Sequence, residues 1–344
     1  MAVTIQDVAH RAQVSISTVS RVLNGTARVR EDKRVRVEEA VQALGYAPNP
    51  NAQSLLKHKT GGIGVILPYV TGEFFSDLLM GIDKTAQDNG YFLLISTSHR
   101  DEGDIKRALR TMYKRVDGLL IMAPEIEEDL VQHITGQDTP VVFMNTQTGS
   151  ITSDVVLFDN FQAFYDITAY VLGLGHRRLA VIKGPPNAYD AQERLRGFHA
   201  AIDGFGRADV QVVEIGEEVI QDQVLDAYSL EAGYWAGREI AKMTPRPTVV
   251  LAPNDQNAIG VLHAFHEVGL RVPDDISVTG FDNVTNARYA IPALTTVGVH
   301  VRQMGTTAAE RLLQQMEDRI TTSSFAYTLE SELVVRNSTS APST

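Results

Sequence analysis

The sequence predicts an α/β protein in which a short helical head precedes two doubly wound parallel sheets. In the first fifty residues, apolar side chains recur at helical spacing and no strand pattern is visible. From Gly61 onward, short apolar runs alternate with longer amphipathic segments, which is typical of parallel strands covered by helices on both faces. There are too many of these units for one mononucleotide-type sheet. We therefore expect two lobes, with a ligand cleft at the carboxyl ends of their strands.

The first element, residues 3–24, predicts two short helices joined by a tight turn. Thr4 is placed to cap the first helix, with Asp7 three residues later in the [ST]-x-x-[DE] pattern. Ser15 is placed to cap the second helix, and Asn24 with Gly25 ends it. The outward face of the second helix carries Ile16, Ser17, Thr18, Ser20 and Arg21. Short polar side chains followed by an arginine suit a helix that enters a DNA major groove, although a helical hairpin of another function has the same pattern.

A third helix is expected from about Glu31 to Leu44, ended by Gly45. The two prolines of residues 46–50 then stiffen a linker, in which Asn49 and Pro50 make a good helix start. Residues 51–56 predict one or two helical turns. A helix this short is unstable alone in water, so we expect it to form only when something packs against it.

The core begins with the apolar run GIGVILP, which predicts a buried strand. Further strands are expected at YFLLIST, DGLLIM, PVVFMN, DVVLFD, LAVIK, TVVLA and ISVTGF. Helices are expected at residues 75–90 and 105–112, before Gly175, from about Asp190, and after Asn254.

Composition bounds the class of protein. The chain has 344 residues, no cysteine and no apolar run of the roughly 18 residues that a membrane span needs. With no secretory signal pattern at the N-terminus, we expect a soluble, cytoplasmic protein without disulfides or thiolate chemistry. The net charge of −11 is unevenly distributed: residues 1–59 carry nine Lys/Arg and five Asp/Glu, and the remainder 22 and 37. A basic head on an acidic body suits contact with nucleic-acid phosphates through the head, although charge alone is weak evidence.

Motifs along nearly the whole chain resemble the LacI/GalR family of bacterial transcription regulators. They are residues 3–24, the 46–56 linker, Gly175–Arg178, Arg194-x-x-Gly197-Phe198, Asn254-Asp255, Ile276–Asp282 and Leu294–Val297, in the family order. The resemblance implies a helix-turn-helix DNA-binding domain (1–47), a linker with a hinge helix (48–60) and a core similar to periplasmic sugar-binding proteins (61–338). It places the first lobe at about 61–160 and 293–323, and the second at about 161–292 and 324–338.

For the head, the resemblance implies a dimer that binds a near-palindromic double-stranded operator. Leu55 matches the family's hinge leucine, which wedges into the minor groove, unless it is a core residue instead. Thr18 and Ser20 are better placed for phosphates than for bases. The predicted DNA-contacting residues are Thr4, Ile16, Ser17, Thr18, Ser20, Arg21, Asn24, Asn49, Ala52 and Leu55.

For the core, the resemblance implies a small-molecule effector in the cleft, with a sugar or sugar derivative as first choice. Aromatic faces stack on the apolar side of a sugar, while carboxylate, amide and guanidinium groups bind its hydroxyls. Arg194 could instead cap a strand end, and Tyr69 could lie at the lip. The predicted effector-contacting residues are Tyr69, Phe74, Asn145, Arg194, Tyr228, Asn254 and Asp282. A sugar phosphate would explain Arg194 about as well, and a purine or a partner protein stays open as the signal.

Other classes of protein find less support. The sequence has no phosphate-binding loop and no G-x-S-x-G elbow, and we expect no enzyme activity and no cofactor. His263 and His266 are spaced like a metal pair but lack an evident third ligand, so we expect no metal site. Trp235 lies in an Ala/Gly-rich helix, where we expect it in the core. A sugar-binding protein without DNA function is the alternative that the basic head and missing signal argue against.

Overall fold

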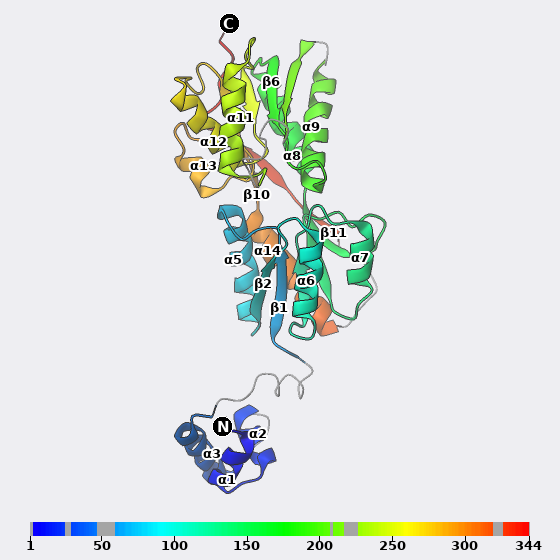
Figure 1. The fold of residues 1–344 in the computed structure, drawn as a ribbon, viewed down its shortest axis with the longest axis vertical. Coiled ribbons are helices and arrows are strands. Elements are labelled where there is room, and N and C mark those ends of the chain that lie inside the picture. Colours follow the sequence, from blue (N-terminus) through cyan, green and yellow to red (C-terminus); the bar gives the residue numbers. More distant parts are fainter. Residues whose placement is uncertain are drawn as a thin grey trace. The chain divides into compact units, whose positions relative to one another are not determined.

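The computed structural model describes residues 3–24, 29–46, 59–206, 209–216, 226–318 and 326–343 (Figure 1). The chain divides into two compact units, Met1–Gly61 and Gly62–Thr344. The predicted hinge helix, with Asn49, Ala52 and Leu55, lies outside the described residues. Among the described residues, no helix is long and apolar enough to cross a membrane.

The head contains helices α1 (Ile5–Ala12), α2 (Ile16–Asn24) and α3 (Glu31–Leu44). Thr4 and Asp7 form the predicted capping box, in which the Thr4 backbone N–H donates to Asp7 Oδ2 at 2.8 Å. At the start of α2, the Thr18 backbone N–H donates to Ser15 Oγ at 3.2 Å. Buried side chains from all three helices form one small core: Val8, Ala9, Ala12, Val19, Val37 and Ala40.

The first lobe of the core is built on a parallel sheet with the order β11-β5-β4-β3-β1-β2. Its strands are β1 (Gly62–Leu67), β2 (Phe92–Thr97), β3 (Gly118–Ile121), β4 (Val141–Met144), β5 (Asp154–Phe158) and β11 (Ala326–Leu329). Its helices are α5 (Glu73–Asp88), α6 (Glu102–Met112), α7 (Glu128–Thr135) and α14 (Val301–Asp318). The central strands β1, β3 and β4 are buried throughout, as near-continuous apolar runs require.

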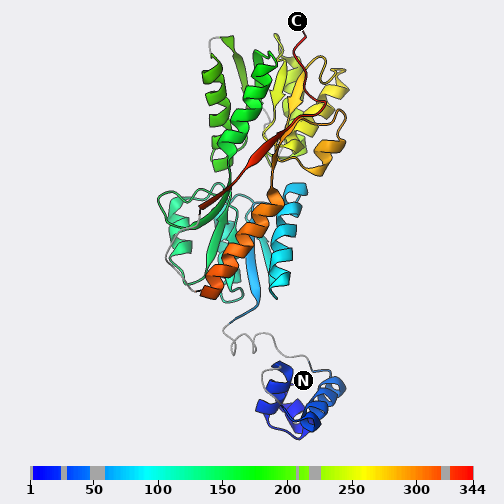
Figure 2. The same cartoon turned by 180° about the vertical axis from the view of Figure 1, so that it is seen from behind.

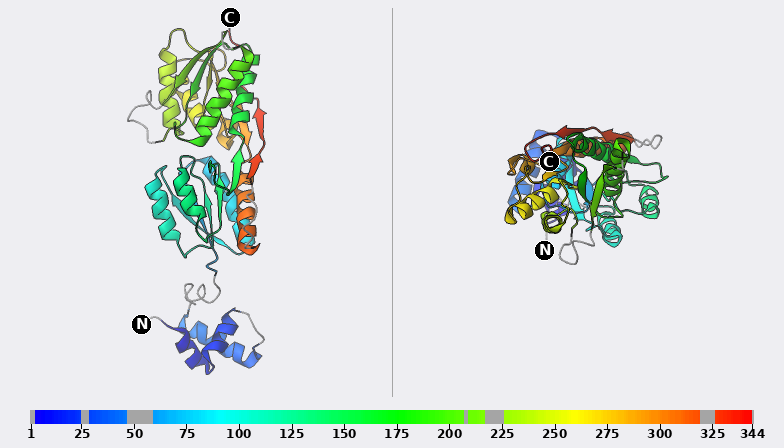
Figure 3. Two further views of the ribbon diagram at one scale, coloured as in Figure 1. Left: turned by 90° about the vertical axis from the view of Figure 1, so that its right-hand side faces the viewer. Right: turned by 90° about the horizontal axis from the view of Figure 1, so that it is seen from above.

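The second lobe is built on a parallel sheet with the order β7-β6-β8-β9. Its strands are β6 (Arg178–Ile182), β7 (Gln211–Ile215), β8 (Val249–Leu251) and β9 (Ser277–Thr279). Its helices are α8 (Asn160–Gly173), α9 (Tyr189–Phe205), α11 (Leu230–Lys242), α12 (Asp255–Glu267) and α13 (Thr285–Tyr289). In both lobes the strands lie between helices on either side (Figure 3). The α/β class and the doubly wound arrangement predicted from the sequence are confirmed.

The two lobes are joined by segments that pass from one to the other. One connection follows β5 into α8, and another follows β9 through β10 (Thr296–Val299) into α14. The third runs from β11 into β12 (Ser331–Val334), which pairs antiparallel with β10. Seen from behind, this ribbon crosses the junction of the lobes next to α14 (Figure 2).

Helices α5 and α14 pack side by side against the first sheet (Figure 2). Glycines allow this close approach, because a Cβ on Gly81 would lie 2.1 Å from the Arg302 carbonyl oxygen. A Cβ on Gly305 would likewise lie 2.2 Å from the Leu78 carbonyl oxygen. The backbones therefore touch where side chains would otherwise separate the helices.

Candidate effector pocket and DNA-binding head

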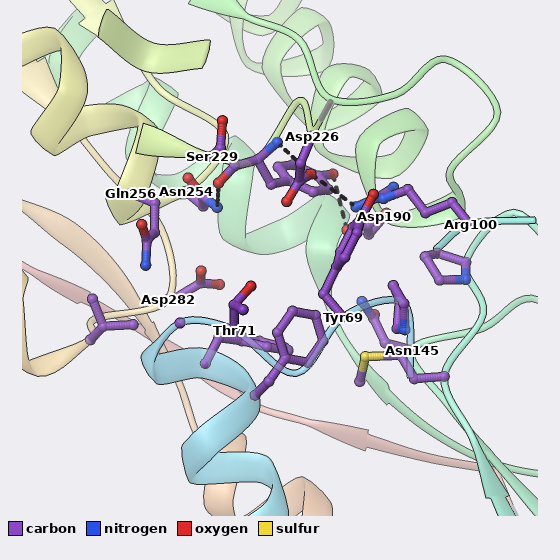
Figure 4. Close-up of a pocket in the computed structure, with 18 of the residues that line it drawn as sticks. Tyr69, Thr71, Arg100, Asn145, Asp190, Asp226, Ser229, Asn254, Gln256 and Asp282 are labelled. Carbon is purple, nitrogen blue, oxygen red and sulfur yellow. Dashed lines mark hydrogen bonds and ion pairs between the residues drawn. The ribbon is translucent and has the colours of Figure 1, made fainter. Parts of the chain in front are cut away.

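A cavity of about 250 Å³ lies between the lobes of the core (Figure 4). Such a volume lies just below the range of about 300–1,000 Å³ that small-molecule sites occupy. Its walls are formed largely by residues that follow the carboxyl ends of strands, as the topology of parallel sheets dictates. All seven predicted effector-contacting side chains line it: Tyr69, Phe74, Asn145, Arg194, Tyr228, Asn254 and Asp282. Their contacts with an effector stay a prediction.

Asp282, just beyond β9, presents a carboxylate at the cavity. The residue is only 8 % exposed, and its backbone adopts a positive φ of 101°. In the described part of the chain, no hydrogen-bond donor or ion-pair partner reaches the carboxylate. Burial raises the pKa of Asp282 well above its ordinary value, while the positive charge of Arg194 acts in the opposite direction. A ligand that supplied hydroxyl or N–H donors would satisfy this group.

Arg194, on α9, is held by groups from three parts of the core. Its Nε donates to Asn160 Oδ1 at 2.9 Å, and one terminal nitrogen donates to the Pro253 carbonyl oxygen at 2.6 Å. The guanidinium also lies 3.9 Å above the ring centroid of Phe281. It therefore enters the cavity in a fixed orientation, with donors left over for a ligand.

Asp190 lies one helical turn before Arg194 and lines the same cavity. Tyr228 Oη donates to Asp190 Oδ2 at 3.0 Å, whereas Asp190 Oδ1 is buried without a hydrogen-bond partner. Burial, together with the negative charge of Asp190, raises the pKa of Tyr228 well above its ordinary value. The cavity thus offers a second free carboxylate oxygen besides those of Asp282.

Arg100 closes the opposite end of the cavity from Asp282 (Figure 4). Its guanidinium pairs with Glu125, lies 4.0 Å from Asp226 in the second lobe, and covers the Tyr228 ring at 5.0 Å. Burial raises the pKa of Glu125, while the adjacent Arg100 charge lowers it. Because Glu125 already neutralises Arg100, this end of the cavity offers little net positive charge.

Two of the predicted amides are engaged with the protein as well as facing the cavity. Asn145 Oδ1 accepts a hydrogen bond from Asn160 Nδ2 at 3.0 Å, which leaves the Asn145 amide hydrogens for a ligand. Asn254 caps α12, since its Oδ1 accepts from the Asn257 backbone N–H at 2.8 Å. Its Nδ2 donates to the Tyr228 carbonyl oxygen at 2.9 Å. Asn254 therefore has a structural role whatever it contributes to a ligand.

Sequence reasoning missed several residues that line the cavity: Thr71, Arg100, Asp190, Asp226, Ser229 and Gln256. Two of them carried a usable signal. Arg100 follows the strand YFLLIST, so it belongs at the carboxyl edge of the first sheet. Asp190 precedes Arg194 by four residues on one helix and therefore shares its face.

The exposed face of α2 carries the predicted DNA-reading residues. Ile16 is 45 % exposed, and Ser17 and Arg21 are also exposed. Ser15 Oγ lies within hydrogen-bond distance of both Ser17 and Thr18, at 2.8 and 2.9 Å. Ser20 is half-buried, and the hydroxyl of Thr4 is engaged in the capping box. The structure describes Asn24 as the last residue of α2 but not its side chain.

Trp235 does not lie in the core. The prediction that it does is wrong, because 37 % of the residue is exposed and its ring packs edge-on against Tyr234. The Ala and Gly residues of α11 bury a different face, which packs on α12. His263 pairs with Glu267 at 3.5 Å. Within the described ranges, no three His, Cys, Asp or Glu side chains are grouped as metal ligands.

Comparisons with known proteins agree with this arrangement. Residues 4–49 match the family model of bacterial regulatory proteins of the lacI family, and residues 168–339 match a periplasmic binding protein-like domain. The HTH-type transcriptional repressor PurR of Photobacterium profundum is 33 % identical over 97 % of this chain and 98 % of its own. The PurR of Photorhabdus laumondii is 36 % identical over 91 % and 90 %.

Solved structures agree as well. The lac repressor dimer bound to operator and the anti-inducer ONPF matches with a TM-score of 0.84 and 29 % identity, over 99 % of this chain and all of that one. A complex of the transcriptional regulator CelR with cellobiose matches with a TM-score of 0.69 and 26 % identity, over 98 % and 99 %. The chain belongs to the LacI family of bacterial regulatory proteins and is a DNA-binding transcriptional repressor, not an enzyme.

Proposed function

We propose that this repressor binds a near-palindromic operator as a homodimer and that a small, uncharged carbohydrate in the cavity between the lobes sets its DNA affinity. The proposal places the protein in the cytoplasm with its DNA. The observation that carries it is the donor-free, buried carboxylate of Asp282 in a cavity that both lobes line.

The chemistry of the cavity supports a polyhydroxylated ligand. Asp282 and the free oxygen of Asp190 need hydrogen-bond donors, and Arg194 and Asn145 offer donors in return. The Phe74 side chain supplies an apolar surface, and the rings of Tyr69 and Tyr228 also line the cavity. A sugar combines hydroxyls that both donate and accept with an apolar ring face, so one molecule can satisfy all of these groups.

The charge of the cavity argues against a phosphorylated ligand. Its lining includes four carboxylates, Asp190, Asp226, Glu231 and Asp282, against the two guanidinium groups of Arg100 and Arg194. Arg100 is paired with Glu125, and Arg194 lies 3.8 Å from Asp190, so each positive charge of the lining already faces a carboxylate of the protein. We therefore expect an unphosphorylated sugar to bind more tightly than its phosphate ester.

A nucleobase is the second candidate. Its support is the relationship to repressors named PurR, at 33–36 % identity over most of the chain. A planar base would also use the aromatic walls formed by Phe74 and Tyr228. The free carboxylate oxygens at two separate points favour the sugar, because hydroxyls are distributed around its whole ring.

The proposed mechanism is a shift between two arrangements of the lobes. A ligand that touches both lobes binds the closed arrangement better than the open one, and it changes DNA affinity only by that difference. The two arrangements of the lobes then hold the two heads of the dimer differently, so the heads fit the two half-sites of the operator to different degrees. Whether the ligand releases DNA or promotes binding is decided by which arrangement fits the operator.

A thermal-shift panel on the full-length protein tests the ligand class. The panel pairs each of several mono- and disaccharides with its phosphate ester and adds purine and pyrimidine bases. At 100 times its dissociation constant, a true ligand adds about 2.7 kcal/mol, or roughly 5–10 °C. The proposal predicts a shift with an unphosphorylated sugar and little or none with its phosphate. A shift with a base alone, or with phosphate esters alone, would refute the carbohydrate assignment.

A further inference from the structure

Asp255 is fully buried, and it does not line the cavity. It is the first residue of α12, and its backbone N–H donates to the Phe281 carbonyl oxygen at 2.8 Å. Its carboxyl oxygens accept from the Val284 backbone N–H at 2.8 Å and from the Thr296 hydroxyl at 2.6 Å. One side chain thus connects the turn after β9 with β10, the strand that leads into the other lobe.

The turn at residues 282–284 contains two residues with positive φ. Asp282 and Asn283 have φ values of 101° and 58°. Aspartate and asparagine enter the left-handed region more readily than other residues except glycine, but the φ of Asp282 lies beyond the usual well at roughly 50–70°. Such a turn persists only when its surroundings hold it.

Groups of the surrounding core hold the turn at each of its residues. The Asp282 backbone N–H donates to the Val297 carbonyl oxygen at 2.9 Å, and the residue bridges to Gly298. Asn283 Oδ1 accepts from an Arg336 guanidinium nitrogen at 2.6 Å. Asp255 holds the turn at Val284. Without its carboxyl group, the Val284 backbone N–H would lose this acceptor.

The absence of a side chain at Gly280 leaves room for the Asp255 carboxyl group. A Cβ on Gly280 would lie 2.2 Å from Asp255 Oδ1, so the space for this carboxyl exists only because residue 280 is glycine. The charged groups that act on the Asp255 side chain are Arg336 and, beyond the turn, Asp282. Asparagine at 255 could accept from Val284 and donate to the Thr296 oxygen, so it would keep both contacts.

We propose that Asp255 is a positioning residue of the effector site: it holds the turn at residues 282–284 so that the Asp282 carboxylate points into the cavity, and it does not touch the effector itself. The inference rests on the proposed function, because that function assigns Asp282 to the effector. Through Thr296, the same side chain keeps the turn in register with β10.

Hydrogen exchange of the full-length protein, without any added ligand, tests this role. The variants are Asp255→Ala, Asp255→Asn and Thr296→Val, and the signals followed are the amides of residues 282–284 and the Asp282 carboxyl ¹³C resonance. We expect Asp255→Ala to speed exchange at Val284 about tenfold, as the loss of one buried hydrogen bond implies, and to move the Asp282 titration midpoint. Asp255→Asn should stay close to wild type, and Thr296→Val should fall between them.

Asp154→Ala is the matched control, because Asp154 is also a buried carboxylate but lies on β5 in the other lobe, paired with Arg311 at 2.5 Å. It should lower overall stability without selective loss of protection at residues 282–284. Unchanged protection in Asp255→Ala, or equal loss in Asp154→Ala, would overturn the positioning role. The hydrogen-exchange experiment contains no sugar, so its outcome does not depend on the carbohydrate panel. A failed panel would refute the proposed effector but would not change what hydrogen exchange shows about the turn.

Discussion

At the scale of single residues, the buried carboxyl groups of the core differ in their hydrogen-bond partners. Asp282 faces the cavity without a donor, whereas Asp255 is satisfied by two donors beneath the same turn. Burial without a partner costs stability, and a ligand that supplied hydrogen-bond donors to Asp282 would offset that cost.

Replacing Asp282 with asparagine separates its effect on the stability of the free protein from its effect on effector affinity. Asp282→Asn replaces a buried acid, whose ionised form burial disfavours, with a neutral amide, so we expect a higher melting temperature for the free protein at any pH at which Asp282 is ionised. It also removes charge-assisted hydrogen bonds to the effector, each worth about 1.5–3 kcal/mol, so affinity should fall roughly 10- to 150-fold. Calorimetric titration with the sugar found in the panel measures both quantities. The control is Asp274→Asn at an exposed carboxylate, which should change neither.

In the head, Ile16 and Arg21 are expected to act differently on DNA. Arg21→Ala should weaken binding about tenfold and reduce the dependence of affinity on salt by about one phosphate contact. Ile16→Ala should relax the preference for thymine at one position, because its apolar contact suits the thymine methyl group. Anisotropy titrations at several salt concentrations measure the first effect, and base-substituted operators the second. An Arg21→Ala variant with unchanged affinity would show that this face does not read DNA.

Asp255 makes the free energy of unfolding depend on pH, and the direction of this dependence follows from its pKa. Burial raises the pKa of Asp255 from its ordinary value of 3.8 to about 7, against the opposing effect of its hydrogen bonds with Thr296 and Val284. The folded protein therefore keeps this proton up to about pH 7, whereas the unfolded chain releases it near pH 4. Since the folded state binds more protons in that window, stability decreases as pH rises from 4 to 7 and is then level.

Urea unfolding between pH 5 and pH 8 measures this contribution. Asp255 should account for a loss of about 2–3 kcal/mol over that range. Asp255→Asn should remove this part of the slope, and it should be more stable than wild type at pH 8. An identical slope in the two proteins would show that Asp255 does not titrate in this window.

At the scale of elements, strands with continuous apolar runs could be predicted from the sequence, whereas strands with interrupted runs could not. The buried strands β1, β3 and β4 are continuous apolar runs and were predicted from the sequence. Strand β7 was missed because it lies at a sheet edge, where half of its side chains face solvent and the apolar run is interrupted. Strands β10 and β12 pair between residues that are 32 to 38 positions apart, and such pairing leaves no local pattern.

The lining of the cavity was predicted only in part. Asp282 was predicted because it ends a buried strand, and Arg194 because it begins the Arg-x-x-Gly-Phe motif. Tyr228 was predicted from the family resemblance, but its contact with Arg100 and the approach of Arg100 to Asp226 arise only where the two lobes meet, and no spacing in the sequence records them. The hydrogen bond of Tyr228 with Asp190 likewise depends on two elements 38 residues apart.

Helix packing in the first lobe depends on glycine at the contact of α5 and α14. Gly81→Ala would place a methyl group 2.1 Å from the Arg302 carbonyl oxygen, so the helices must move apart, at a cost of about 1–3 kcal/mol. Gly173→Ala, at the end of α8, is the control, because nothing lies within 4 Å of its added carbon. Chemical denaturation should show Gly81→Ala destabilised and Gly173→Ala unchanged or slightly stabilised. Equal stability of the two variants would contradict the close-packing argument.

At the scale of the whole molecule, the protein combines a head that binds DNA with a core that holds a cavity between two lobes. Strands β10 and β12 and the connection from β5 to α8 are the only described segments that join these lobes. Any ligand that bridges Asn145 of the first lobe and Asp282 of the second would bias their relative arrangement. Effector and operator are then coupled through one equilibrium, and the coupling must be reciprocal.

Operator affinity measured with and without the sugar found in the panel tests whether the ligand in the cavity controls DNA binding. Fluorescence anisotropy on a selected operator, with full-length wild type and Asp282→Asn, gives the four dissociation constants required. We predict that the sugar changes the wild-type constant about 5- to 150-fold, the usual range of such coupling, and that Asp282→Asn shows little change at the same sugar concentration. A sugar that binds the wild type but leaves its operator affinity unchanged would refute control of DNA binding by the cavity.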